Sequence, residues 1–366
     1  MKALTMSRDT LLRPLQAVAG VVERRNTLPI LDCVGVHLEG GRLSLVATDL
    51  QLQISQGVFL EDVSSQFAVT VPARKLLEIV RALPEGELSL AVQGERLALR
   101  SASGRVSLQT QAFDALPRVT PVLAQTSLVL AQGAFRALLA QVYFAMGQQD
   151  VRYFMNGVQL LIEGDELCVV ALDGCRLARA TLATGVQLAR HDCILPRKTV
   201  LELMRLLESG DAPLSIELAR DQARFVFGDT ELLSKLIDAR FPDTQRAIPN
   251  APTQRLTIAR APWLKAMQRA VLLAPEKFRS VRLLIEAGQM TMQAQNAAHD
   301  EAEEYLAVAY QGSPLEISFN AVYLLDVLSH LDSESVELGL DAGSLSALLT
   351  IPGNSRYQYV AMALRN

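Results

Sequence analysis

The sequence has few of the residues that build disulfide-stapled or catalytic proteins. Its 366 residues include 4 cysteines, 4 histidines and 1 tryptophan. Four scattered cysteines in a chain of this length are too few for a disulfide framework, so we expect free thiols. No apolar run approaches the roughly 18 to 20 residues that cross a bilayer, and the amino-terminal segment lacks the pattern of a secretory signal. We therefore expect a cytoplasmic protein with no membrane partner.

Motifs for enzyme chemistry are also missing. The sequence contains no G-x-S-x-G, Walker A or H-E-x-x-H motif, so the common nucleophile, nucleotide and zinc sites are not predicted. One acidic run, with His299, Asp300, Glu301, Glu303 and Glu304, could bind a divalent cation and leaves a metal-dependent nuclease open as an alternative. Such runs are more often solvated loops or partners of a basic surface. We expect no catalytic residues, no metal and no cofactor.

The charge balance excludes one simple kind of nucleic-acid binding. The 35 basic and 39 acidic residues give a formal net charge of −4, so the chain does not coat a polyanion with surplus positive charge. Local clusters of lysine and arginine can still bind phosphates, because the DNA backbone responds to nearby charge rather than to the total. Half of the residues are hydrophobic, and the length predicts about two to three domains.

The sequence repeats itself. LSLVATD at 43–49 matches LCVVALD at 167–173, and KLLEIVRAL at 75–83 matches TVLELMRLL at 199–207, both at a spacing of 124 residues. A third copy of the second segment, YLLDVLSHL at 323–331, follows 124 residues later. Two matches at one spacing indicate duplicated units. We predict three domains, at 1–120, 126–249 and 253–366, joined by short linkers.

Each unit shows the same order of elements. Alternating apolar residues flank Gly40 and Gly41 in the first unit and Gly164 and Asp165 in the second, which predicts a hairpin in each. One helix precedes the hairpin and another follows the strands. The pattern predicts an α+β fold in which antiparallel sheets are covered on one side by two helices per unit.

The second helix of each unit has an apolar stripe and a polar face. Leu76, Ile79, Val80 and Leu83 have the spacing of a buried stripe and leave Arg74, Glu78 and Arg81 outward. The second unit repeats this pattern, with Val200, Leu203, Met204 and Leu207 inside and Lys198, Glu202 and Arg205 outside. Further basic residues lie nearby: Arg8, Arg13, Arg24, Arg25, Arg152 and Arg197. A helix layer that faces phosphates without reading bases is predicted, and a repeat scaffold that binds only proteins stays open.

Six segments resemble one known family. They are VVERRNTLPIL at 21–31, FAMGQQDVRYFMNGV at 144–158, DGCRLA at 173–178, LPRK at 195–198, SKLIDARFPD at 234–243 and YVAMALRN at the carboxyl end. Spread over the whole chain in this order, they resemble the bacterial DNA sliding clamp, the beta subunit of DNA polymerase III.

The resemblance implies three repeated clamp-type domains, each with antiparallel sheets outside and two helices inside, that form half of a closed ring. Two chains would associate head to tail as a homodimer around double-stranded DNA. Such a protein is a processivity factor in DNA replication and not an enzyme. It slides without sequence specificity and tethers replicative and repair DNA polymerases, and a clamp-loader ATPase complex opens and closes it.

The resemblance also implies two sets of surface residues. Residues expected to approach DNA are Arg24, Gln149, Arg152, Tyr153, Arg197 and Lys198. The dimer interface is expected to use Leu272 and Leu273, with Arg74, Lys75, Arg96 and Arg105 on one edge and Glu301, Glu303 and Glu304 on the other. Opposite charges on the two edges favour a head-to-tail contact over a head-to-head one.

The family's partner pocket captures short peptides with a glutamine and hydrophobic anchors. The matching positions are Arg152, Phe154, Met155, Leu172, Gly174, Cys175, Arg176, Leu177, Pro242, Arg246, Ala247, Asn320, Tyr323, Ser346, Val360, Met362, Ala363, Leu364 and Arg365. The family commonly has threonine, histidine, proline and a hydrophobic residue where this chain has Leu172, Cys175, Ala363 and Asn366. A specialised second-copy clamp with altered partner or inhibitor binding is therefore an alternative.

Overall fold

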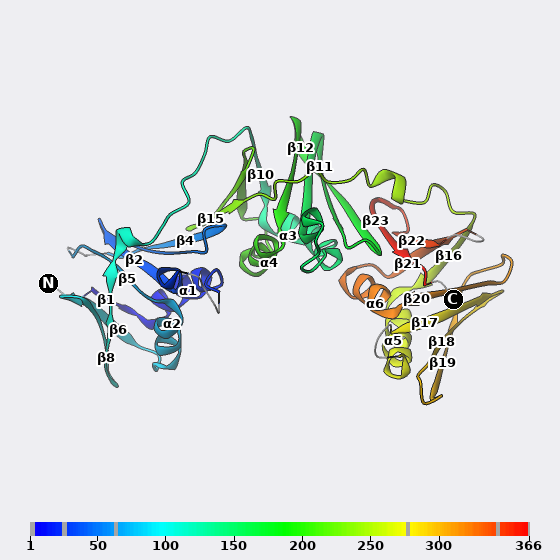
Figure 1. The fold of residues 1–366 in the computed structure, drawn as a ribbon, viewed down its shortest axis with the longest axis horizontal. Helices are drawn as coiled ribbons and strands as arrows, with labels where there is room; N and C mark the ends of the chain where they lie inside the picture. Colours follow the sequence, from blue (N-terminus) through cyan, green and yellow to red (C-terminus); the bar gives the residue numbers. More distant parts are fainter. Residues whose placement is uncertain (1–3, 24–27, 62–64, 276–278, 342–344, 365–366) are drawn as a thin grey trace. The chain divides into compact units, whose positions relative to one another are not determined.

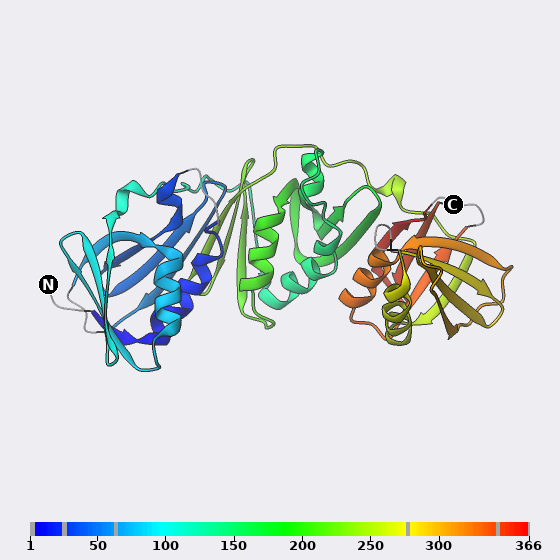
Figure 2. The ribbon, with the colours of Figure 1, turned by 60° about the horizontal axis from the view of Figure 1, so that its bottom comes forward.

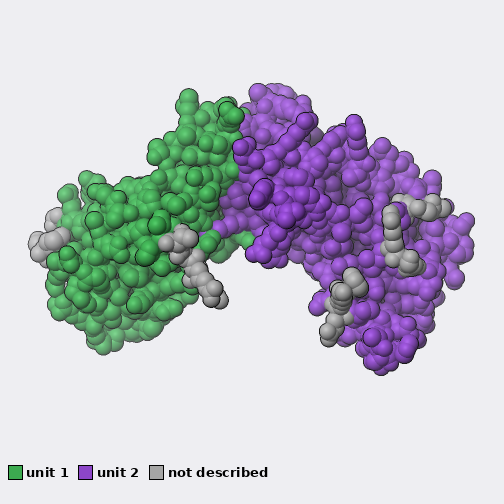
Figure 3. Space-filling view, viewed as in Figure 1, with its two compact units in different colours: residues 1–136, 201–236 green, residues 137–200, 237–366 purple. Residues whose placement is uncertain are grey.

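The computed structural model of the chain describes residues 4–23, 28–61, 65–275, 279–341 and 345–364. These fold into two compact units, one with residues 1–136 and 201–236, the other with residues 137–200 and 237–366 (Figure 3). The two units are defined by contacts within the fold and not by the sequence repeats. The three predicted domain boundaries therefore stay a prediction. Among the described residues, no helix is long and apolar enough to cross a membrane.

Unit 1 contains a nine-stranded and a four-stranded antiparallel sheet (Figure 1). The larger sheet has the order β10 (Thr126–Ala131), β13 (Pro213–Leu218), β14 (Gln222–Phe227), β15 (Thr230–Lys235), β4 (Leu52–Phe59), β3 (Arg42–Thr48), β2 (Cys33–Glu39), β5 (Phe67–Pro72) and β9 (Gln111–Ala112). The smaller has the order β1 (Leu4–Ser7), β6 (Glu87–Gln93), β7 (Arg96–Ser101) and β8 (Gly104–Gln109). Helices α1 (Arg8–Ala19) and α2 (Ala73–Ala82) lie side by side against them (Figures 1 and 2). Short 3-10 turns are η1 (Pro29–Asp32) and η2 (Phe113–Ala115).

Unit 2 contains a six-stranded and a four-stranded antiparallel sheet. The larger sheet has the order β11 (Gly157–Leu172), β12 (Arg176–Pro196), β23 (Asn354–Met362), β22 (Ser346–Ile351), β21 (Ser335–Leu340) and β16 (Gln254–Ala259). The smaller has the order β19 (Glu301–Ala307), β18 (Gln289–Gln295), β17 (Ser280–Glu286) and β20 (Leu315–Asn320). Its helices are α5 (Arg260–Ala270) and α6 (Ala321–His330), with 3-10 turns η3 (Tyr143–Ala145), η4 (Tyr153–Asn156), η5 (Gln245–Ala247) and η6 (Val271–Leu273). Helices α3 (Gln132–Ala140) and α4 (Arg197–Leu206) each begin in one unit and end in the other.

The first predicted hairpin is confirmed. Strands β2 and β3 pair up to Glu39 opposite Arg42. Gly40 and Gly41 between them have φ of +55° and +78°, a conformation that glycine adopts without steric cost. In the central repeat, both halves of the predicted hairpin belong to the one element β11, whose register is interrupted around Gly164. This irregularity of the register therefore lies where the sequence predicts a turn.

The predicted apolar stripes are largely buried. In α2, Leu76 and Val80 are buried and Ile79 is half-buried, so the helix presents one apolar face inward. In α4, Val200 and Leu203 are buried at the equivalent positions. The stripes follow from the 3.6-residue period, and they fix which side chains of each helix remain outward.

An arginine of the first helix caps the second helix in every repeat. Its guanidinium donates hydrogen bonds of 2.8 to 3.2 Å to a carbonyl near the second helix's C-terminus, with pairs Arg8–Val80, Arg136–Met204 and Arg260–Leu328. These carbonyl oxygens have no partner inside the helix and carry partial negative charge. The assignment of Arg8 to a DNA-facing cluster is therefore wrong, because its guanidinium is used to join α1 to α2.

Two sheets continue from one repeat into the next. In unit 1, β4 of the first repeat pairs with β15, the last strand of the second, from Thr230 opposite Gln56 to Ser234 opposite Leu52. In unit 2, β12 of the second repeat pairs in the same way with β23, the last strand of the third. The third repeat's counterpart of β4 and β12 is β19, and the first repeat's counterpart of β15 and β23 is β8. Each of these two strands lies at the end of its sheet.

Candidate functional sites

An apolar cluster in unit 2 brings together four of the predicted pocket residues. Met155 comes from η4, Leu172 from the end of β11, Leu177 from the start of β12 and Val360 from β23, and all four are buried. Others in the cluster are Cys168, Val170, Ile194, Phe241, Ile248 and Leu348. The pairing of β12 with β23 places Leu177 opposite Val360. The cluster is therefore a packed floor formed by the second and third repeats.

More polar and more exposed residues surround this floor. Gly174, with φ of +90°, and the exposed Cys175 form the turn between β11 and β12. The Met362 amide donates a 2.8 Å hydrogen bond to the Cys175 carbonyl, and the Met362 side chain is 49% exposed. Ala363 continues the tail, since its amide donates to the carbonyl of Leu345 at 2.7 Å. The tail is thus fixed by backbone bonds while its methionine side chain points partly to solvent.

Phe154 packs against the floor, and further predicted pocket residues lie in three places. Asn320 is the N-cap of α6 and accepts a hydrogen bond from the Val322 amide. Pro242, Arg246 and Ala247 are exposed on the connector between the buried Phe241 and Ile248. Ser346 pairs with Met362 across β22 and β23, and the Leu364 amide donates to the Ser318 carbonyl at 2.8 Å. Arg365 lies outside the described residues.

Arg176 joins the second and third repeats. Its side chain is 10% exposed, and it forms ion pairs with Asp173 at 2.9 Å and with Asp326 of α6 at 2.6 Å. It also donates to the Phe144 carbonyl at 2.6 Å and lies 4.7 Å from the ring centroid of Tyr323. Burial raises the pKa of Tyr323 to about 12. Sequence reasoning placed Arg176 in the pocket but missed this junction role.

A second contact of the same junction lies beside Arg176. The ring of His330 at the end of α6 stacks on Phe144, with centroids 4.6 Å apart. Its Nε2 is 3.0 Å from the Tyr143 hydroxyl, and its Nδ1 donates to the Asp326 carbonyl at 2.7 Å, since a carbonyl oxygen only accepts. Residues from η3 and α6 therefore add a second contact between the second and third repeats.

One loop and the start of the 3-10 turn η4 contain three of the residues expected at DNA. Gln149, Arg152 and Tyr153 are exposed there, and Gln149 has φ of +56°. Arg152 is not a free cation, because its Nε and Nη2 each donate to the Asp150 carboxylate at 2.9 Å. These bonds lower the pKa of Asp150 to about 2. Since the pKa is lowered, the charge pair persists at neutral pH and is lost only as the pH falls through about 2.

The start of α4 lies beside the same loop. Arg197 donates to the Met146 carbonyl at 3.3 Å, and Lys198 is half-buried. Arg24 lies outside the described residues. The structure thus brings Arg197 close to the loop that contains Gln149, Arg152 and Tyr153.

The predicted outward face of α4 needs a correction. Arg205 donates to the carbonyl oxygens of Gln16 and Ala17, at the C-terminal end of α1, and forms an ion pair with Glu202. The Glu202 side chain is only 12% exposed. Neither residue belongs to a free polar face, because both pack against a helix of another repeat.

The basic residues expected at a subunit interface lie on α2 and on the four-stranded sheet of unit 1. Arg74 and Lys75 are exposed on α2, and Arg74 donates to the Val22 carbonyl at 3.0 Å. Arg96 on β7 donates to Ser107, and Arg105 on the edge strand β8 donates to Gln93. Strand β8 therefore presents an open edge with guanidinium groups beside it.

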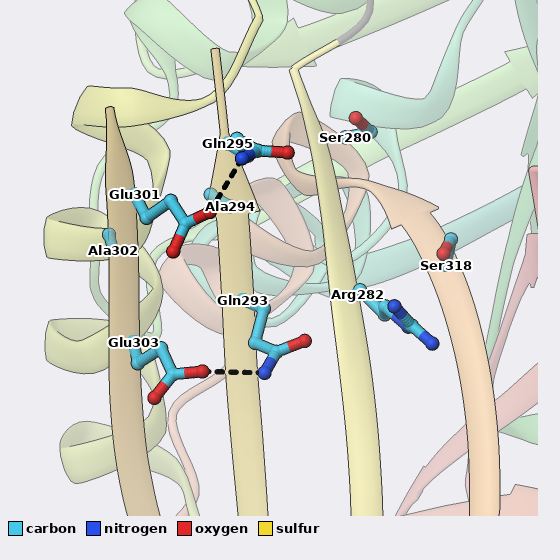
Figure 4. A pocket seen from close by; sticks show the side chains of 9 residues that line it. All are labelled: Ser280, Arg282, Gln293, Ala294, Gln295, Glu301, Ala302, Glu303 and Ser318. Atoms are coloured by element: carbon cyan, nitrogen blue, oxygen red, sulfur yellow. Dashed lines mark hydrogen bonds between the residues drawn. The ribbon is translucent and has the colours of Figure 1, made fainter. Parts of the chain in front are cut away.

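The acidic residues expected at the interface lie on the edge strand β19. Glu301 and Glu303 face a polar trough of about 420 Å³ on the outer side of the sheet, where they accept hydrogen bonds from Gln295 and Gln293 (Figure 4). Glu304 points to the opposite face and forms an ion pair with Arg269 of α5, which lowers its pKa. The expectation of one acidic cluster is therefore wrong, because alternate side chains of a strand point to opposite faces.

The same geometry counts against the nuclease alternative. Among the described residues, no group of three or more histidine, cysteine, aspartate or glutamate side chains is placed to hold a metal ion. Directly after α5, Leu272 in η6 is 78% exposed, whereas Leu273 is half-buried. An exposed leucine and an acidic strand edge thus occur in the same repeat.

Comparisons with known proteins cover the whole chain. The family models for the N-terminal, central and C-terminal domains of the DNA polymerase III beta subunit match residues 2–120, 129–243 and 245–365. The beta sliding clamp of Pseudomonas putida is 40% identical over 363 residues, and that of Escherichia coli K12 is 40% identical over 362 residues; each match covers 99% of both chains.

Solved structures give the same result. The DNA polymerase III subunit beta from Pseudomonas aeruginosa has a TM-score of 0.95 at 39% identity and covers 100% of both chains. A sliding clamp from the same species, solved bound to griselimycin, has a TM-score of 0.95 at 40% identity and covers 100% of this chain and 99% of the other. The similarity extends over all three repeats.

Proposed function

Because the chain belongs to the DNA polymerase III beta subunit family, the beta sliding clamps, we propose that two copies close head to tail into a ring that encircles duplex DNA and acts as a processivity factor. The observation that carries the ring is the strand pairing between repeats. Strand β4 pairs with β15, and β12 pairs with β23. The strands left over, β8 and β19, would pair between copies, and a heterologous contact of this kind closes a ring when its rotation allows.

The charges along these two edges support the same pairing. Arg105 lies on β8, whereas Glu301 and Glu303 lie on β19, so a head-to-tail contact brings opposite charges together and a head-to-head contact brings like charges together. Leu272 would be covered at this contact. Opening of the ring needs a clamp-loader ATPase, since this chain has no nucleotide-binding loop.

The closed ring around the duplex and a small number of contacts to its phosphates would hold the DNA. Gln149, Arg152, Tyr153, Arg197 and Lys198 would approach the duplex, together with Arg24. Contacts of this kind give affinity without sequence information. The clamp has no chemistry of its own in this proposal.

The floor formed by Met155, Leu172, Leu177 and Val360 supports a peptide site for replicative and repair polymerases. A flexible methionine such as Met362 at its edge suits several apolar ligands. Tethering through such a site raises the effective concentration of a polymerase at the primer end.

The test of enclosure uses DNA topology. We expect the loaded protein to stay on nicked circular DNA in high salt and to be released once the circle is cut to a linear form. Salt weakens ionic contacts equally on both DNA forms, so only a closed ring distinguishes them. Equal release from circular and linear DNA would contradict the proposal. The measurement is gel filtration of labelled protein with DNA before and after linearisation.

Asp150 offers a test of the DNA-facing loop. Replacing Asp150 by asparagine removes the charge that holds Arg152, so the guanidinium becomes available to a phosphate. We expect affinity for a short linear duplex at low salt to rise roughly two- to threefold, with a steeper salt dependence. Fluorescence anisotropy measures both quantities. The control is Glu163→Gln, which releases the exposed Arg190 elsewhere in the repeat and should change neither. A weaker or unchanged DNA affinity in Asp150→Asn would show that Arg152 does not contact DNA.

A further inference from the structure

The chain covers the meeting point of its first and second repeats with its own connector, residues 117–125. We call the region around β4 and β15 the first junction and the region around β12 and β23 the second junction. Buried Val46, Phe113 and Leu116 form an apolar cluster beside the first junction. Val46 stands 124 residues before Val170, which belongs to the floor in unit 2. The first junction therefore has an apolar floor of its own.

Two glutamines hold this first connector by its backbone. The side chain of Gln53 on β4, a residue that is 6% exposed, accepts a 2.9 Å hydrogen bond from the Val119 amide. Gln222, at the start of β14, donates to the Thr120 carbonyl at 3.1 Å and accepts from the Val122 amide at 3.2 Å. The two side-chain amides thus bind the connector through its main chain, which is how many grooves bind a peptide.

Side chains of the first connector also pack on the junction. Val119 is buried, and the guanidinium carbon of Arg118 lies 4.3 Å from the ring centroid of Phe113. A cavity of only about 10 Å³ remains between the connector and the strands β13 to β15, which is about the room that one water needs. The Gln125 amide donates to the Leu218 carbonyl at 2.8 Å and ties the connector to β13. The chain itself therefore fills the first junction.

The second junction has other residues at the positions of the two glutamines. Gln53 and Gln222 stand 124 residues before Leu177 and Ser346. The strand positions agree as well, because Gln53 and Leu177 are second in β4 and β12, and Gln222 and Ser346 are first in β14 and β22. A leucine side chain has no hydrogen-bonding group, and that of serine is shorter than that of glutamine. The positions that hold a connector in one junction therefore belong to the expected peptide pocket in the other.

The connector of the second junction makes its hydrogen bonds differently. The amides of Ala247 and Ile248 donate to the carbonyls of Thr244 and Gln245, within and beside the turn η5. These bonds form inside the connector and use no side chain of β12 or β22. The two connectors thus differ in whether the adjoining strands bind their backbone.

We propose that the first connector is an internal peptide ligand of the first junction, and that Gln53 and Gln222 hold it there, so that each copy offers peptide partners one site, in the second junction. The inference rests on the peptide site proposed above and explains why the repeat does not supply two. A segment attached by short linkers has an effective concentration of about millimolar, so a free peptide of ordinary affinity does not displace it. Replacing both glutamines releases the connector and opens the first junction.

The test gives the first junction the residues of the second. In the full chain with both Gln53→Leu and Gln222→Ser, we expect the amides of Val119 and Val122 to exchange with deuterium at least tenfold faster than in the wild type. Isothermal titration with a synthetic polymerase-derived peptide should give two bound peptides per chain, against one for the wild type.

A matched control and a milder variant accompany this test. Gln254→Leu removes a glutamine that also accepts a hydrogen bond, from the Tyr310 hydroxyl, and should change neither the exchange nor the stoichiometry. Thermal melting of each variant verifies that the fold is retained. If the double variant does not fold, Gln222→Ser alone, at a half-buried position, should still speed exchange at Val122 and leave Val119 protected. Unchanged exchange at Val122 in that variant overturns the inference.

The outcomes separate this inference from the function on which it rests. Connector amides that stay protected in the double variant overturn the inference and leave the peptide site intact. The same holds if the amides lose protection but the stoichiometry stays at one. Two peptides per wild-type chain also overturn it, because the first junction is then already open. A wild-type chain that binds no peptide overturns the proposed peptide site and this inference with it.

Discussion

Replacing Leu272 and Leu273 together by alanine is expected to leave the chain monomeric at concentrations where we expect the wild type to form the proposed dimer. Leu272 is 78% exposed in the single chain, so its truncation removes little packing from the fold. At a contact between copies the same leucine would be fully covered, and burying one leucine side chain contributes about 1.5 to 3 kcal/mol. A loss of this size from two residues raises a dissociation constant by at least a hundredfold.

Sedimentation velocity over a concentration series measures this change. A suitable control is Leu123→Ala, because Leu123 is also highly exposed but lies in the connector after the first repeat. Its truncation should leave the dimer intact. A double leucine variant that remains dimeric would place the interface elsewhere. Loss of retention on circular DNA should accompany the loss of the dimer.

Replacing Arg176 by alanine is expected to lower the free energy of unfolding and to weaken peptide binding together. The buried guanidinium joins Asp173 and Asp326, so its removal leaves two carboxylates without their partner. Breaking such a pair costs about 3 to 5 kcal/mol when it is fully buried. Because Asp326 is partly exposed, we expect about 2 kcal/mol, measured by urea unfolding.

Peptide affinity should fall because Arg176 holds α6 against the floor of the proposed pocket. We expect at least a tenfold loss for a polymerase-derived peptide, measured by isothermal titration. Arg190→Ala is the matched control, since Arg190 makes a single exposed ion pair with Glu163 and should change stability by less than about 0.5 kcal/mol. Unchanged peptide affinity in Arg176→Ala would show that the contacts of Arg176 with Asp173 and Asp326 do not support the proposed pocket.

Local patterns were enough to predict the elements of the fold. The helix predicted at 75–83 is found at Ala73–Ala82, and the turn at Gly40 and Gly41 has the expected left-handed backbone. Both depend on neighbouring residues alone, through the helical period and the conformational freedom of glycine. The repeat then extended the same assignment to the other units.

Contacts between repeats could not be predicted in this way. Arg205 reaches Gln16, 189 residues away, and Arg176 reaches Asp326, 150 residues away. A pattern of exposed and buried positions classifies such arginines as surface residues, because it has no information about the partner. One signal was available, since Glu78, Glu202 and Asp326 place an acid at the same position of all three repeats.

The sheet that joins β15 to β4 also affects how the protein melts. Its hydrogen bonds cross a repeat boundary, so neither strand can lose its structure without exposing the other's backbone. The first repeat and the last strands of the second therefore form one cooperative block. The chain consists of three similar repeats, but the blocks in which we expect it to unfold have their limits inside the central repeat.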